Sequence, residues 1–378
     1  MKYDFDSVTD RSGTAAWKWQ VKEGELPMWV ADMEIKTAPE VIGALEERAA
    51  HGIFGYTDIE DAWYEAYTGW WERRHGFTMK REGLIFCTGV IPAISSMVRK
   101  LTTPNEKVVI LTPVYDIFYN CIENNGCRAL ECELVYKDGA YSIDFEDLEK
   151  KLADPQSRLL LLSNPHNPTG NIWSAEELQR MGELSKRYGV TVISDEVHCD
   201  IVRPGKSYVP FASVSPLCAE VSASCLSPSK AFNLAGIHSA AVYAENEILR
   251  HKVWRGINTD EAGEPNVFAQ CAAEAAFNKG GEWLDALMAY LFNNRDRAEE
   301  FIKNEIPGIE TVHSDATYLL WMKSGRDAAE IREKTGLILS EGREYGKGGE
   351  GFVRMNLACP STMLEDGLGR LKRALENI

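Results

Sequence analysis

Ten residues, Ser227-Pro-Ser-Lys-Ala-Phe-Asn-Leu-Ala-Gly236, decide how the rest of this sequence is interpreted. The preceding segment, Val221-Ser-Ala-Ser-Cys-Leu226, is small and apolar and predicts a short buried strand. The residues that follow, Ala231-Phe232, are compatible with the start of a helix. Most lysines are solvated surface charges, but Lys230 is expected at a junction that holds it out of water. A desolvated lysine loses its proton more readily and can attack a carbonyl group.

Two further buried strands are predicted upstream, and polar residues follow each of them. Leu159–Ser163 leads into the rigid turn Asn164-Pro-His-Asn-Pro-Thr-Gly170, which presents Asn167. Val190–Ser194 leads directly to Asp195. Ligands of open α/β sheets bind beyond the carboxyl ends of the strands. An amide, a carboxylate and an amine are therefore expected in one crevice.

Pyridoxal phosphate requires this combination of groups. Asn167 can donate to its phenolic oxygen, Asp195 can keep its pyridine nitrogen protonated, and Lys230 can hold its aldehyde. The hydroxyls of Ser227 and Ser229, together with free N–H groups at a helix start, suit its phosphate. The residues therefore predict pyridoxal phosphate as the cofactor.

Composition is that of a soluble globular protein and argues against several classes of function. The chain has 378 residues, 44% hydrophobic and 26% charged, which is enough for two domains with a sizeable core. The net charge of −16 and the lack of a Lys/Arg run argue against a nucleic-acid partner. No apolar run approaches the roughly 18 residues of a membrane span, and the N-terminus lacks an apolar signal core. We therefore expect a cytoplasmic protein with no membrane partner.

Nine cysteines are scattered without a Cys-x-x-Cys pair, which predicts reduced thiols. Neither a disulfide nor a zinc site is expected, and no metal is assigned. His198 and Cys199 suggest a nucleophile pair, but neighbours on a strand point to opposite faces, which disfavours it. The cysteines are Cys87, Cys121, Cys127, Cys132, Cys199, Cys218, Cys225, Cys271 and Cys359.

Strand-like and helix-like segments alternate through the middle of the chain and predict an α/β fold. Such alternation requires a mainly parallel sheet with helices on both faces. Backbone N–H groups of Val90 and Ile91, at the start of the first helix, would suit a phosphate. Ser174-Ala-Glu-Glu177 is a capping box for a later helix. The predicted strands are Ile85–Gly89, Lys107–Leu111, Arg128–Leu134, Arg158–Leu162 and Val190–Ser194, and the helices are Pro92–Leu101, Tyr115–Asn124, Asp144–Leu152 and Ser174–Tyr188.

The N-terminal segments are predicted to be structural. Leu26–Met33 is apolar apart from Asp32 and is expected to be buried and extended. Thr37-Ala-Pro-Glu40 is interpreted as a capping box that opens a helix. The next helix, Asp58–His75, carries an aromatic stripe, which is typical of a core or of a subunit contact. Its members are Trp63, Tyr67, Trp70 and Trp71.

The C-terminal part predicts a second, smaller α+β domain. A long helix, Glu282–Asn304, can bridge two domains. Strands at Thr317–Met322 and Phe352–Leu357 and helices at Asp327–Thr335 and Thr362–Glu376 follow it. A site between the domains would follow from this division. The predicted domains are a large cofactor-binding domain of residues 48–285 and a small domain of residues 1–47 and 286–378.

The sequence resembles the aminotransferase class I/II group of fold-type I pyridoxal-phosphate enzymes. The Asn-Pro-x-Asn-Pro-Thr-Gly turn, the Ser-x-Ser-Lys loop and Arg354 within Phe-Val-Arg-Met-Asn are similar to that family's motifs and follow its order. The spacings support the resemblance, with Asn167 and Asp195 28 positions apart and Asp195 and Lys230 35 apart. It implies the fold of the pyridoxal-phosphate-dependent transferases.

A narrower resemblance, to the MalY/PatB-like branch of cystathionine β-lyases or carbon–sulfur lyases, runs from one end of the chain to the other. It implies β-elimination from a small sulfur amino acid, which gives a thiol, pyruvate and ammonia, by a homodimer. The segments that carry it are Asp10-Arg-Ser-Gly-Thr14, Trp29-Val-Ala-Asp-Met33, His51-Gly-Ile-Phe-Gly-Tyr56, Asp195-Glu-Val-His198, Ser229-Lys-Ala-Phe-Asn-Leu-Ala-Gly236 and Gly349-Glu-Gly-Phe-Val-Arg-Met-Asn-Leu-Ala-Cys-Pro360.

The resemblance implies a role for each residue of the site. Lys230 is the Schiff-base lysine, Asp195 pairs with the pyridine nitrogen, and Arg354 takes the substrate carboxylate, which its guanidinium fork can bind bidentately. The other implied positions are Asn167 at the phenolic oxygen, Tyr115 on the ring and at the substrate, Val90, Ile91, Ser227 and Ser229 at the phosphate, His198 at the cofactor, Ala31 at the substrate, and Tyr56 at the phosphate of the other subunit.

Two histidines depart from the pattern of the better-known aminotransferases. His198 stands where those enzymes usually carry a tyrosine, and His238 where they usually carry a phosphate-binding arginine. His238 is therefore either a phosphate contact or an ordinary buried histidine. An aminotransferase would use the same catalytic residues, so it remains the alternative to a lyase. A non-catalytic regulatory protein that binds the cofactor is a third hypothesis.

Overall fold

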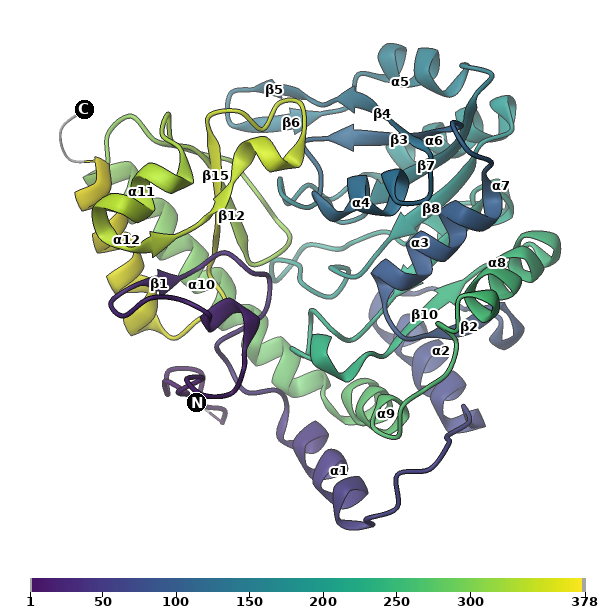
Figure 1. The fold of residues 1–378 in the computed structure, drawn as a ribbon, viewed down its shortest axis with the longest axis horizontal. Coiled ribbons are helices and arrows are strands. Elements are labelled where there is room, and N and C mark those ends of the chain that lie inside the picture. The colour runs from purple at the N-terminus through teal and green to yellow at the C-terminus, as the bar shows by residue number, and fades with distance from the viewer. Residues whose placement is uncertain (1, 376–378) are drawn as a thin grey trace.

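The computed structural model describes residues 2–375 (Figure 1). A larger group of strands and helices and a smaller one are connected by the long helix α10 (Gly281–Glu305), which contacts α9 (Ala269–Lys279) and α12 (Ser361–Leu375). Within residues 2–375 no helix has both the length and the apolar character needed to cross a membrane.

The larger group is built on a seven-stranded sheet in the order β2-β10-β9-β8-β7-β3-β4. Only β10 runs antiparallel to its neighbours, and the other pairs are parallel. This mainly parallel sheet confirms the predicted α/β class. The strands are β2 (Leu84–Cys87), β3 (Lys107–Thr112), β4 (Arg128–Glu133), β7 (Ser157–Ser163), β8 (Thr191–Asp195), β9 (Ser222–Leu226) and β10 (Ala240–Tyr243).

Alternating side chains of β3 show why helices cover both faces of this sheet. Val108 and Ile110 belong to a buried cluster with α3, α4 and α8, whereas Val109 and Leu111 belong to a cluster with α5 and α6. The α6 helix has the predicted capping box, because Ser174 and Glu177 each bind the other's backbone N–H. These helices are α3 (Val90–Leu101), α4 (Ile117–Glu123), α5 (Phe145–Leu152), α6 (Ala175–Tyr188) and α8 (Glu247–Thr259).

The aromatic stripe of α2 (Asp61–His75) lies in the core. Its four rings are at most 2% exposed and pack against α9 and the β2 and β10 strands. The preceding helix, α1 (Pro39–Ala50), begins one residue after Ala38, so the predicted Thr37 capping box is wrong. Thr37 makes no capping bond, and Pro39 starts the helix with a suitable fixed φ.

The smaller group contains a four-stranded sheet in the order β11-β12-β15-β14, in which β15 pairs antiparallel to both neighbours. The N-terminal β1 (Leu26–Pro27) pairs parallel with β13 (Leu337–Ile338), so the chain's beginning joins this group. Helices α11 (Ala328–Thr335) and α12 pack on it. Its strands are β11 (Glu310–Thr311), β12 (Leu319–Lys323), β14 (Ser340–Glu341) and β15 (Phe352–Asn356). Glu376, the predicted end of the last helix, lies outside the described residues.

No α-helix begins directly after Lys230, so the prediction of a helix start at Ala231-Phe232 is wrong. Residues 231–239 form turns and one short 3-10 helix, η4 (Ala235–Ile237). Asn233 adopts a positive φ of 54° and its side chain binds the backbone of Met33 and Ile35. These long-range hydrogen bonds override a local sequence that is compatible with a helix. Further elements that were not predicted include β10, α7 (Pro216–Val221), α8 and the hairpin of β5 (Val135–Lys137) and β6 (Ala140–Ser142).

Candidate active site

A cavity of about 210 Å³ lies at the carboxyl ends of β8 and β9, beside the start of α3. Ligands of open α/β proteins bind at this carboxyl-terminal edge of the sheet. Seven of the residues predicted at the cofactor site line this cavity. They are Val90, Ile91, Tyr115, Asp195, Ser227, Ser229 and Lys230.

Lys230 is held against the N-terminal segment of the chain. Its Nζ donates a hydrogen bond of 2.7 Å to the carbonyl oxygen of Ala31. Burial, together with the positive charge of Arg354, lowers the pKa of Lys230 to about 8. Roughly a tenth of its amine is therefore unprotonated at pH 7, far more than for an ordinary lysine, as a nucleophile or a base requires.

Asp195 ends β8 and is only 6% exposed. Burial raises the pKa of its carboxyl group to about 7, although the Val197 N–H, 3.2 Å away, and the charge of Lys230 both lower it. No Lys, Arg or His side chain lies within ion-pair distance of Asp195 among residues 2–375. A cationic N–H group placed in the cavity would stabilise this carboxylate.

Arg354, on β15 of the smaller sheet, is 4% exposed. Its guanidinium donates to Asn167 Oδ1 at 2.9 Å, to the Trp29 carbonyl at 3.0 Å and to Ser340 Oγ at 3.3 Å. Its Nε has no hydrogen-bond partner, and it forms no ion pair with any carboxylate of the described chain. A buried cation of this kind is suited to bind an anion from outside the chain.

The first turn of α3 meets the requirements of a phosphate site. The N–H groups of Val90 and Ile91 precede the first intrahelical bond, which Ala93 donates to Gly89 at 3.1 Å. No acidic residue lies in this turn, so its positive potential is not neutralised. Ser229 lies across the same cavity, on the loop that carries Lys230.

The side chains of Ser227 and Asn167 are already engaged in hydrogen bonds within the chain. The hydroxyl of Ser227 donates to the Ser239 carbonyl at 2.8 Å and accepts the Ser229 N–H at 3.1 Å, so it shapes the loop. Asn167 does not line the cavity itself. Its backbone carbonyl accepts the Tyr115 N–H at 3.0 Å, and its side chain accepts a hydrogen bond from Arg354. Asn167 therefore connects Tyr115, which is predicted to stack on the cofactor ring, with Arg354, which is predicted to bind the substrate carboxylate.

The two histidines differ from each other in burial. His198 is 3% exposed, and burial with the charges of Lys230 and Arg354 holds its pKa well below the ordinary value, so the ring is neutral. His238 lines the cavity but is exposed, so the reading of it as a buried histidine is wrong. Tyr56 is fully exposed and lies outside this cavity.

Tyr318 belongs beside the site, although no sequence motif indicated it. Its hydroxyl donates to the Ala31 carbonyl at 3.0 Å, the same oxygen that accepts from Lys230. Tyr318 precedes β12, which pairs with the strand of Arg354. Only this pairing between strands far apart in the sequence brings the tyrosine to the site.

The cavity and its donors fit pyridoxal phosphate. A reactive amine, an unpaired buried carboxylate and a helix N-terminus without acidic residues face the same space, and these three groups suit the aldehyde, the pyridinium and the phosphate. The unpaired guanidinium of Arg354 lies close enough to lower the pKa of Lys230. The arrangement can therefore hold this cofactor and leaves a buried cation beside it that is free to bind an anion.

Comparison with known proteins identifies the family. The family model for aminotransferase class I and II matches residues 30–371, and the chain belongs to that family. It is 43% identical to cystathionine beta-lyase PatB of Bacillus subtilis, with 98% of this chain and all of that protein covered. It is 32% identical to protein MalY of Escherichia coli, with both chains fully covered.

The fold of a solved carbon–sulfur lyase matches closely. The pyridoxal-phosphate-bound C–S lyase from Staphylococcus hominis superposes with a TM-score of 0.94 at 34% identity, covering 99% of this chain and 98% of that one. These likenesses confirm the predicted family, the fold type I architecture, pyridoxal phosphate as the cofactor, and the carbon–sulfur lyase class of activity.

Proposed function

We propose that this protein cleaves the bond between the β-carbon and sulfur of a cysteine thioether such as L-cystathionine. The names of the relatives, cystathionine beta-lyase and C–S lyase, support this substrate class. The single observation that carries amino acid binding is the buried guanidinium of Arg354, which has no carboxylate partner within residues 2–375. Its bidentate geometry suits the α-carboxylate of the substrate.

Each group of the cofactor has a proposed partner, and all of these partners except Asn167 and His198 line the cavity. Lys230 holds the aldehyde carbon, Asp195 the pyridine N–H, and Asn167 and Tyr115 the ring and its phenolic oxygen. The phosphate is bound by Val90, Ile91 and Ser229, with Ser227 shaping their loop and His198 lying neutral nearby. When bound, pyridoxal phosphate supplies an electron sink next to the α-carbon of the substrate.

The residues of the chain then have separate tasks in β-elimination. Arg354 binds the α-carboxylate and fixes the orientation of the α-carbon. Lys230, whose amine would be set free when the substrate's α-amine takes its place and whose pKa is lowered to about 8, takes the α-proton as its amine. The electron pair of the broken C–S bond leaves with sulfur, and the thiolate takes up a proton, which the Lys230 ammonium can return. Water completes the stoichiometry, with thiol, pyruvate and ammonia as products.

Dimer formation, location and domain boundaries are further parts of the proposal. We propose a homodimer in which Tyr56 reaches the phosphate site of the partner subunit, because this fully exposed residue lies on a cavity of about 580 Å³ with Gly236 and Ile237. Ile237 is adjacent in sequence to His238, which lines the cofactor cavity. We also propose a cytoplasmic protein with domains of residues 48–285 and of 1–47 with 286–378.

Turnover without a keto acid is the decisive test. Purified holoenzyme is incubated with L-cystathionine and no 2-oxoglutarate or pyruvate, and thiol, pyruvate and ammonia are measured over time. We expect equal amounts of all three through many turnovers, because elimination restores the starting enzyme. One turnover followed by arrest, relieved by added 2-oxoglutarate, would establish the aminotransferase alternative. Stable cofactor binding without turnover of any sulfur amino acid would support the regulatory protein instead.

A further inference from the structure

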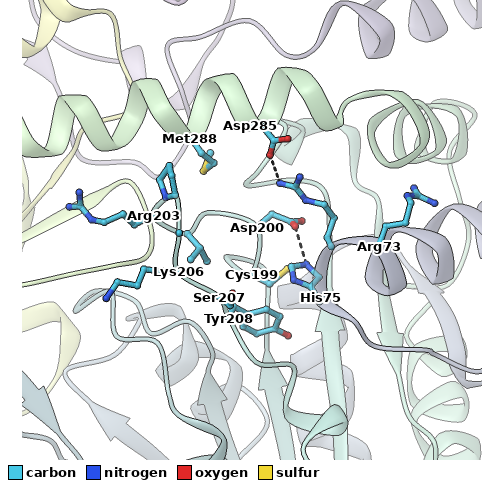
Figure 2. Close-up of a pocket in the computed structure, with 14 residues that line it drawn as sticks. Arg73, His75, Cys199, Asp200, Arg203, Lys206, Ser207, Tyr208, Asp285 and Met288 are labelled. Carbon is cyan, nitrogen blue, oxygen red and sulfur yellow. Dashed lines mark hydrogen bonds and ion pairs between the residues drawn. The ribbon is translucent and has the colours of Figure 1, made fainter.

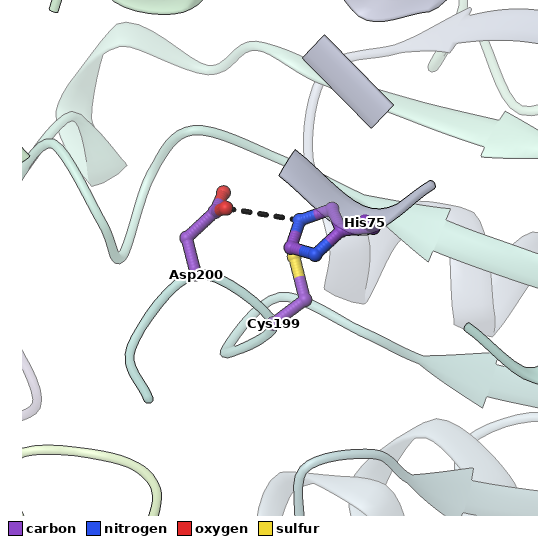
Figure 3. A group of neighbouring side chains, drawn as sticks. All are labelled: His75, Cys199 and Asp200. Carbon is purple, nitrogen blue, oxygen red and sulfur yellow. Dashed lines mark hydrogen bonds and ion pairs between the residues drawn. The ribbon is translucent and has the colours of Figure 1, made fainter. Parts of the chain in front are cut away.

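A histidine, a cysteine and an aspartate meet outside the cofactor cavity, where the end of α2 lies against the loop that follows Asp195. His75, the last residue of α2, lies beside Cys199 and Asp200, as Figure 3 shows. One potential ligand atom from each lies within 4.8 Å of the others. His75 Nε2 is 3.0 Å from Asp200 Oδ1. None of the three lines the cofactor cavity, so this cluster is separate from the site described above.

The cluster is deeply buried and has few counter-charges. The side chains of Asp200 and His75 are 2% and 8% exposed, and Cys199 is 1% exposed. Asp200 forms an ion pair only with His75 among the described residues, and Trp70 Nε1 donates to both of its oxygens at 3.1 Å. Buried carboxylates are stabilised by a cation or a metal ion. A carboxylate has lone pairs left after accepting these bonds.

We propose that His75, Cys199 and Asp200 bind a single Zn²⁺ ion. Imidazole, thiolate and carboxylate are the three ligand types that zinc takes from proteins. Ligands bonded at about 2.0 to 2.3 Å are roughly 3.3 to 3.8 Å apart in a tetrahedral site, so an inward movement of about 1 Å completes the geometry. One thiolate and one carboxylate also balance the charge of the ion.

A cavity of about 570 Å³ next to the cluster leaves room for the fourth ligand. All three residues line it, and Figure 2 shows them on its wall below α10. Of the Arg and Lys side chains that line the cavity, Arg73 donates to the Phe277 carbonyl at 3.0 Å, and the other three have acidic partners. Arg74 pairs with Asp285 at 2.7 Å, and Arg203 and Lys206 pair with further aspartates. Their charges are therefore largely neutralised and do not exclude a metal ion, which keeps a water molecule at its open position.

The test uses zinc alone as the probe. Chelator-treated holoenzyme is mixed with Zn²⁺, separated from free metal, and analysed for zinc per chain. Affinity is measured by competition with a chromophoric chelator. The variants are Cys199→Ser and His75→Gln, which each remove one ligand at nearly constant volume. Cys271→Ser is the matched control, because Cys271 is the one cysteine that is not fully buried and it lies on α9.

We expect one zinc per chain, an affinity at least about 100-fold weaker in both ligand variants, and no change in the control. X-ray absorption at the zinc edge should show one sulfur at about 2.3 Å. No stoichiometric zinc in the wild type, or equal affinity in wild type and both ligand variants, overturns the proposal. If the variants do not fold, the absorption spectrum of the wild type decides, and zinc without a sulfur neighbour overturns it. These readouts are independent of lyase activity.

Discussion

Two lysines of this chain contact the same stretch of backbone in opposite electrostatic surroundings. Lys18 is 2% exposed, and its Nζ lies 2.8 Å from Glu34 and 3.3 Å from Asp32. Arg11 binds the same two carboxylates, at 2.8 and 3.0 Å. Lys230, in contrast, has only the Ala31 carbonyl as a hydrogen-bond partner and no carboxylate within ion-pair distance in the described chain.

The difference shows that burial alone does not make a lysine reactive. A buried ammonium is costly unless an anion stabilises it. Lys18 has two such anions and is a structural cation. Lys230 has none within ion-pair distance in the described chain, and the more distant charges of Asp32 and Asp195 offset its burial only in part, so its pKa falls to about 8. The same contrast separates Arg354, which has no carboxylate, from Arg295, which pairs with Glu299 at 3.4 Å.

The largest effect is expected from Lys230→Ala. Loss of the amine should abolish covalent attachment of pyridoxal phosphate and lower lyase turnover by at least about 10² to 10⁴, the contribution of a general base. Attachment is measured by borohydride reduction followed by mass spectrometry of the protein. A Lys230→Ala protein that still gives a reduced cofactor adduct would place the attachment at another lysine.

Lys18→Met should lower the free energy of unfolding and leave covalent attachment of the cofactor unchanged. Removing one partner leaves Asp32 and Glu34 with Arg11 alone, and breaking a buried ion pair costs about 3 to 5 kcal/mol. Urea denaturation should show this loss, while borohydride still fixes the cofactor. Lys2→Met removes an exposed pair with Glu282 and is the control that should leave stability unchanged. Equal stability of the two variants would show that Lys18 does not stabilise the fold through its ion pairs.

Arg354→Ala should weaken substrate binding more than cofactor binding. A desolvated charge pair with the α-carboxylate contributes about 2 to 5 kcal/mol, so kcat/KM should fall mainly through KM. Steady-state kinetics and cofactor titration measure the two effects separately. Arg343→Ala provides an exposed control nearby on the chain. If Arg354→Ala weakens cofactor binding as much as it weakens substrate binding, Arg354 maintains the fold of the site.

The parallel sheet was predictable because its strands are nearly continuous apolar runs. Leu159–Leu162 and Val108–Leu111 are buried on both faces, and such runs between helices indicate a parallel sheet. Polar residues at or just after the ends of three strands, namely Asn167, Asp195 and Lys230, were expected to lie close together. The order of strands and residues along the sequence was enough for this inference.

The remaining features depend on contacts between residues far apart in the sequence. The Ala-Phe-Asn-Leu-Ala segment after Lys230 is compatible with a helix, but Asn233 binds Met33 and Ile35, about 200 positions away. Tyr318 reaches Ala31 across 287 positions. His75 and Asp200 are 125 positions apart, which is why cysteine spacing gave no indication of a zinc site.

The smallest expected effect, a shift in pH dependence, tests the electrostatic argument most directly. Only the unprotonated amine of Lys230 attacks the aldehyde of free pyridoxal phosphate, so its capture by cofactor-free protein should rise with a midpoint near pH 8. An ordinary lysine, with a pKa of 10.5, would give a midpoint more than two units higher. Stopped-flow absorbance across this range measures the rate.

Arg354→Gln sharpens the same experiment, because the positive charge of Arg354 is the second cause, after burial, of the lowered pKa of Lys230. Without that charge the ammonium is more stable, so the midpoint should move upward, by up to about one unit, or roughly 1.4 kcal/mol. Arg343→Gln should leave it in place. A midpoint near 10 in the wild type would mean that Lys230 is solvated like a surface lysine, and a downward shift in Arg354→Gln would show that Arg354 does not repel the ammonium.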